Sequence, residues 1–137
     1  MGFADWEDFF DRSGIRKKCL SWDIRRAVKF DSGGVVRPAG SILVWQSDVR
    51  MNTAGVVNVL KRKGLQPDDL WSQFVLAVTQ FDLRVGGPVV ALGQNHVPLG
   101  NNAVALFVEK GIKNLQLRSL LLDWLDGCRF VVRPIGT

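Results

Sequence analysis

The sequence has no tyrosine, one histidine and two cysteines, so several side chains that commonly perform catalysis or bind metals are scarce. Cys19 and Cys128 lie far apart and no CxxC spacing occurs, which excludes a disulfide framework and the usual zinc motifs. The acidic residues form no Asp-x-Asp loop of the kind that binds calcium. We therefore expect no metal and no cofactor, and we interpret the cysteines as buried, reduced thiols of a cytoplasmic protein.

Long apolar runs are also missing. The longest, Ala103–Val108, is far shorter than the roughly 20 residues that a membrane-spanning helix needs, so we expect no membrane partner. The acidic N-terminal sequence is not typical of a secretory signal or a transit peptide. No GxGxxG or Walker-type glycine motif for phosphate binding is present. Because these motifs are absent, we favour a protein that is not an enzyme, and we predict no catalytic residue.

What the chain does contain is typical of one globular domain over residues 1–137. Hydrophobic residues make up 47% of it and charged residues 23%, a composition that argues against extensive disorder. A chain of this length buries roughly two-thirds of its unfolded surface, so its core needs no metal or disulfide to be stable.

The spacing of apolar residues predicts the secondary structure. Trp6, Phe9 and Phe10 stand at i, i+3 and i+4 and predict a helix over about residues 4–12, which Gly14 ends. We also predict a helix over 16–30 and a pair of helices over 53–79, whose short connection should make them neighbours. Short runs of β-forming residues predict strands at 40–45, 89–92, 103–108 and 129–132.

The clearest helical pattern lies near the C-terminus, where apolar residues recur at i, i+3, i+4, i+7 and i+8: Leu117, Leu120, Leu121, Trp124 and Leu125. It predicts a helix over 115–126 that packs in the core. The order of these elements predicts an α+β fold, with a small, mainly antiparallel sheet of about four strands and helices packed on one face.

Charge is distributed unevenly along the chain, whose net charge is +5. Residues 1–11 carry four acidic and no basic side chains, whereas residues 12–37 carry eight basic and two acidic ones. This basic segment also contains Trp22 and Phe30, and such a mixture is typical of nucleic-acid surfaces, because cations bind phosphates and aromatic rings stack on bases. We predict a non-enzymatic protein that binds nucleic acid without sequence preference, through Arg16, Lys17, Lys18, Trp22, Arg25, Arg26, Lys29 and Arg37.

Other interpretations of these patterns stay open. The basic residues would also suit a solvated helix face that pairs with the acidic residues of the 4–12 helix. That acidic, aromatic helix would suit docking on a protein partner or on a second copy of the chain, in an interaction or accessory module.

A third interpretation is a small-molecule pocket or an enzyme site near the polar loop 93–102, because loops on a rigid scaffold often carry function. Its candidate residues are Gln94, Asn95, His96, Asn101 and Asn102. A thiol nucleophile there would need contact between His96 and one of the cysteines.

Overall fold

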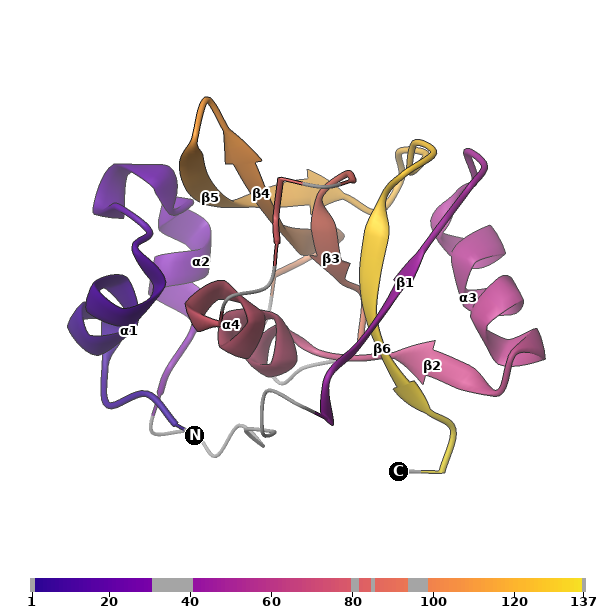
Figure 1. Cartoon of the computed structure of the whole chain (residues 1–137), viewed down its shortest axis with the longest axis horizontal. Coiled ribbons are helices and arrows are strands. Elements are labelled where there is room, and N and C mark those ends of the chain that lie inside the picture. The colour runs from indigo at the N-terminus through magenta and orange to yellow at the C-terminus, as the bar shows by residue number, and fades with distance from the viewer. Residues whose placement is uncertain (1, 31–40, 80–81, 85, 94–98, 137) are drawn as a thin grey trace.

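The structure is a computed structural model that describes residues 2–30, 41–79, 82–84, 86–93 and 99–136. Its centre is a six-stranded sheet in the order β1-β6-β3-β4-β5, with β2 also paired to β6 (Figure 1). The strands are β1 (Leu43–Gln46), β2 (Leu65–Pro67), β3 (Val89–Ala91), β4 (Asn102–Glu109), β5 (Ile112–Ser119) and β6 (Arg129–Pro134). The helices are α1 (Trp6–Ser13), the 3-10 turn η1 (Lys17–Cys19), α2 (Trp22–Ala27), α3 (Thr53–Arg62) and α4 (Leu70–Val78).

Strand β6 lies beside the edge strand β1 and pairs with three other strands. On one side it pairs antiparallel with β1, with Leu43 opposite Val132. On the other side it pairs in parallel with β3 and antiparallel with β2, whose Pro67 also lies opposite Val132. Every pairing in the sheet except β3 with β6 is antiparallel. Three segments that are far apart in the sequence thus meet on one C-terminal strand.

Strands β4 and β5 form a hairpin of two eight-residue strands in continuous register, from Asn102 opposite Ser119 to Glu109 opposite Ile112. The connection is the dipeptide Lys110-Gly111, and both residues have positive φ, 52° and 76°. Such a two-residue turn matches the right-handed twist of the strands it joins. The turn therefore fixes the register of the whole hairpin.

The sheet is covered on both faces, because neighbouring residues of a strand point to opposite sides. In β3, Val89 and Ala91 belong to a core shared with α1, α2 and α4, whereas Val90 belongs to a second core shared with α3. In β6, Val131 faces the first core and Phe130 the second. Within the described ranges, no helix is both long and apolar enough to cross a membrane.

The predicted α+β class and the mainly antiparallel sheet are confirmed, and the sheet is larger than expected. The additional strands are β2, in the expected turn between two helices, and β5, in the expected 115–126 helix. The expectation that helices pack on one face holds for α1, α2 and α4, while α3 lies on the other. The helices α3 and α4 are therefore not neighbours, because β2 in their connection joins the sheet between them. The 16–30 helix is also shorter than predicted, since it consists of η1 and the six residues of α2.

The prediction of a core helix over 115–126 is wrong. Residues up to Ser119 form β5, with Leu115 fully buried, and the next residues form turns in which Leu121 is 82% exposed. The leucine spacing suits a helix, but the tight Lys110-Gly111 turn brings this segment against β4, where it gains a full set of strand hydrogen bonds. Only Trp124 of the predicted stripe beyond β5 is buried.

The N-terminal helix forms close to where the sequence predicts it. Asp5 caps it by accepting the Asp8 N–H at 2.8 Å, and Gly14 ends it with φ 74°. Phe9 and Phe10 are buried in the first core, where Phe9 contacts other rings of the same chain. These rings therefore cover the protein's own core, while docking of this helix on a partner or on a second copy stays a prediction.

Two leucines give a matched test of this fold. We expect Leu115→Ala to cost about 2–5 kcal/mol of unfolding free energy, the usual range for a buried leucine. Leu121→Ala should cost less than about 0.5 kcal/mol, because its side chain already lies in water. Urea unfolding of both variants measures the difference, and a large loss for Leu121→Ala would mean that the 115–126 segment is helical after all.

Candidate functional site

The turn η1 and helix α2 lie along the outer edge of β5. Ser21 donates its N–H to the Leu115 carbonyl at 3.0 Å, and the Gln116 side chain donates to the Cys19 carbonyl at 2.9 Å. Ile24 and Val28 are buried in the core, one helical turn apart. The opposite side of this segment therefore faces solvent, and several of the predicted cations lie on it.

The fold itself uses several cations of the basic segment. Lys17 pairs with Glu7 of α1 at 2.9 Å, and Arg12 pairs with Asp8 at 3.4 Å. The guanidinium of Arg25 lies 5.7 Å from the ring centre of Phe10, a cation–π contact on the core side of α2. The alternative interpretation, pairing with the acidic helix, thus holds for Lys17 and Arg12, and Arg25 is a packing residue.

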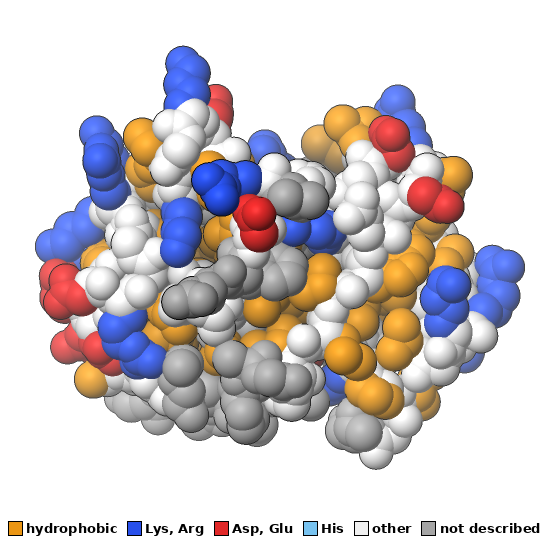
Figure 2. All heavy atoms as spheres, in the orientation of Figure 1, with side chains coloured by type: hydrophobic (Ala, Val, Ile, Leu, Met, Phe, Trp, Pro, Cys, Tyr) orange, Lys and Arg blue, Asp and Glu red, His pale blue; other side chains and the backbone are white. Residues whose placement is uncertain are grey.

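Other residues of the segment stay open to solvent. Trp22, at the first position of α2, is 66% exposed, and Arg26 follows it by one helical turn. Arg16, Lys18 and Arg26 are exposed, and none of them forms an ion pair within the described ranges. Figure 2 shows Lys and Arg side chains gathered over the N-terminal helices and the β4–β5 hairpin. We call Arg16, Lys18, Trp22 and Arg26 the basic face.

The remaining predicted residues contribute less. Lys29 is exposed but has an interaction partner, and Arg37 lies outside the described residues. In the polar loop, Gln94, Asn95 and His96 also lie outside them. Asn102 begins β4 and donates to the Leu99 carbonyl at 3.0 Å, while the Asn101 carbonyl accepts from the Leu120 N–H at 2.9 Å. The Asn102 contact shapes the turn before β4, whereas the Asn101 contact joins two backbones and leaves the exposed Asn101 side chain without an assigned role.

The thiols are poor candidates for chemistry. Cys19 and Cys128 are both free and buried. Burial raises the pKa of Cys128 to about 11, since a thiolate is poorly solvated in the core, so the neutral thiol persists at neutral pH. Among the described residues, no three side chains of the metal-binding types lie close enough together to hold an ion.

One surface was missed by the sequence interpretation. The loop between β5 and β6 exposes Leu121, Leu122 and Leu125, which we call the leucine loop. Trp124 anchors it by donating to the Thr53 hydroxyl at 2.9 Å, and its backbone pairs with that of Met51. A cavity of about 400 Å³ opens beside it, lined on the loop side by Leu122, Trp124, Leu125, Asp123, Asp126 and Cys128. The leucines at 120–122 and 125 were the only sequence signal for this surface, but their spacing favoured a buried helix.

No protein-family model, curated protein or solved structure matches this chain. The case for any function therefore depends on the geometry of the chain alone. Among the surfaces described above, the basic face combines an exposed aromatic ring with cations that form no ion pair with any described acidic residue.

The thiol prediction is tested by alkylation. Because burial raises the pKa of Cys128 to about 11, iodoacetamide should label the folded protein very slowly at pH 8. In urea the thiol pKa should fall back to its ordinary value of 9.0, so labelling should become fast. A Cys19→Ser variant isolates Cys128, and rapid labelling of that variant in its native state would contradict the buried position.

Proposed function

We propose that this protein binds nucleic acid without catalysing a reaction on it, and that the basic face is the contact surface. The observation that carries the proposal is the 66% exposure of Trp22, which has the exposed Arg26 one helical turn further along α2 and the exposed Lys18 shortly before it in the chain. Exposed tryptophan is costly in water, and single-stranded nucleic acid offers both bases for stacking and phosphates for the cations.

The form of the face favours single strands over a sequence-reading mode. Helix α2 has only six residues and is tied to β5, so it offers no long recognition helix for a major groove. Helix α4 is no better suited, because Asp69 caps its N-terminus and the neighbouring Asp68 is buried. Binding should therefore depend on phosphate and stacking contacts that every sequence provides.

Charge reversal on the basic face tests the electrostatic contribution to nucleic-acid binding. In Lys18→Glu with Arg26→Glu, affinity for a short oligothymidine should fall about tenfold or more at about 50 mM salt, and the log–log salt slope should flatten by about one to two. Fluorescence anisotropy over a salt series measures both. Arg25 stays unchanged because it packs on Phe10.

The matched control is Lys61→Glu with Arg62→Glu, which makes the same change of net charge on exposed residues of α3, across the sheet. This control variant should keep most of the affinity.

Trp22→Ala should weaken single-strand binding by about 1–3 kcal/mol, while Trp22→Phe should retain most of the binding. Equal losses in the two double variants, or no binding by the wild-type protein, would contradict the proposal.

The leucine loop favours a second function, the docking of a partner protein. Contiguous exposed leucines are uncommon on isolated proteins. Acidic side chains lie on this loop and on the loop after β1, since Asp48, Asp123 and Asp126 are exposed, and Asp123 pairs with Arg50 at 3.2 Å. Figure 2 shows apolar side chains beside acidic ones where this loop meets the loop after β1. Self-pairing of this loop across a two-fold axis would bring like charges together, so we propose a partner segment with apolar and basic side chains.

Two synthetic amphipathic peptides test this second function. We expect a leucine–lysine helix to bind the protein and a leucine–glutamate helix of equal length to fail, because the acidic rim attracts one and repels the other. Leu122→Ser with Leu125→Ser should abolish binding without lowering the melting temperature, since both side chains are exposed. Binding of both peptides alike, or by the double variant, would sink the idea.

A further inference from the structure

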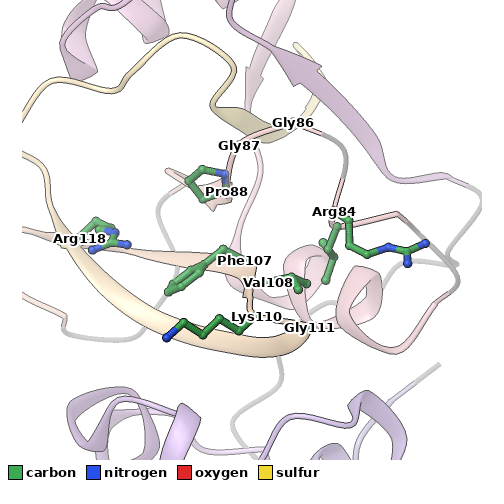
Figure 3. A pocket seen from close by; sticks show the side chains of 10 residues that line it. Arg84, Gly86, Gly87, Pro88, Phe107, Val108, Lys110, Gly111 and Arg118 are labelled. Carbon is green, nitrogen blue, oxygen red and sulfur yellow. The ribbon is translucent and has the colours of Figure 1, made fainter.

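A second concave site, with no lining residue from the basic face, lies between the β4–β5 hairpin and the segment that precedes β3 (Figure 3). Its volume is about 350 Å³. Three cations line it, Arg84, Lys110 and Arg118, and none of its described lining residues is acidic. Figure 3 shows Lys110 and Arg118 on either side of Phe107, whereas Arg84 points away from them. The site therefore has two cations directed alongside one aromatic ring.

Lys110 occupies an unfavourable backbone position. Its φ of 52° is the only positive value of a non-glycine residue among those described, and turns of this type prefer asparagine, aspartate or glycine there. Lysine is thus not explained by the needs of the turn. Backbone strain of this kind recurs at functional sites, where the side chain that is positioned matters more than local stability.

Arg118 is held in place by the sheet. It lies opposite Ala103 in β5, and its guanidinium is 5.2 Å from the ring centre of Phe107. The contact restricts the guanidinium while leaving its N–H groups available, since it forms no ion pair within the described part of the chain. Arg84, by contrast, pairs with Asp82 at 3.4 Å.

The opposite wall is also rigid. The buried Arg129 donates to the carbonyls of Asp82, Leu83 and Gly87, at 2.9, 3.1 and 2.9 Å. Gly87 sits so close to Gly127 that a Cβ would come within 2.8 Å of its carbonyl oxygen. These contacts hold the described residues of this wall against β6 and the residues just before it.

We propose that this pocket binds a phosphate group, held by Lys110 as a point charge and by the planar guanidinium of Arg118. The phosphate belongs to a free mononucleotide or to a nucleic-acid backbone, and the two sources share the chemistry that the pocket recognises. The site does not depend on the basic face, because none of its lining residues belongs to that face.

Amide NMR shifts during titration with inorganic phosphate, AMP and a short oligothymidine test the site. We expect saturable shifts at Gly87, Phe107 and Gly111 with at least one of these probes. Shifts with AMP indicate a free nucleotide, and shifts with the oligonucleotide alone indicate a backbone phosphate. No saturable shift there with any probe would overturn the proposal.

Lys110→Asn separates binding from folding, because asparagine suits the turn better than lysine does. This variant should melt at the wild-type temperature or above it, yet bind about tenfold more weakly, the effect of losing one charge-assisted contact. Arg118→Gln, an exposed position, should weaken binding similarly. Unchanged affinity in both variants would overturn the site. The basic-face variant Lys18→Glu with Arg26→Glu should retain the phosphate or AMP shifts, which keeps this test distinct from that of the proposed function.

Discussion

The buried guanidinium of Arg129 ties the start of β6 to the segment before β3, 42 to 47 residues earlier in the chain. It stands at the start of β6 and donates to three backbone carbonyls of the segment before β3. Burial lowers its pKa, but arginine starts so high that it stays charged, and Asp82 lies nearby. A buried cation needs such partners, so the segment before β3 has little freedom to move away from β6.

The position of β6 has consequences for both cores. Because β1, β2 and β3 all pair with it, neither face of the sheet is complete until the C-terminal strand is in place. Lys113 adds a second link, since its ammonium donates to the carbonyls of Ser13 and Ala77, close to the ends of α1 and α4. A cation at two helix C-termini is favourable because both dipoles point their negative ends toward it.

The surfaces proposed to bind ligands are those that remain after these demands are met. Four cations stabilise the fold itself. Arg129 and Lys113 donate to backbone carbonyls, Arg25 packs on Phe10, and Lys17 pairs with Glu7. Among the described residues, exposed cations that form no ion pair lie on the basic face, beside Phe107 and at the end of α3, where Lys61, Arg62 and Lys63 follow one another. The exposed leucines are apolar residues that the fold likewise leaves on the surface. They follow the end of β5, so they lie beyond the sheet and outside both cores.

The sequence by itself determined the local elements whose signals are complete within a few residues, such as α1 between Asp5 and Gly14, or α3 with its Asn52 cap. It also located the basic segment. Tertiary structure alone decided that residues 112–119 form a strand, because strand hydrogen bonds come from a partner and leucine spacing does not record that partner. It decided too which cations stay free, since a charge count cannot tell Arg26, which faces water, from its neighbour Arg25, which lies on a ring of the core.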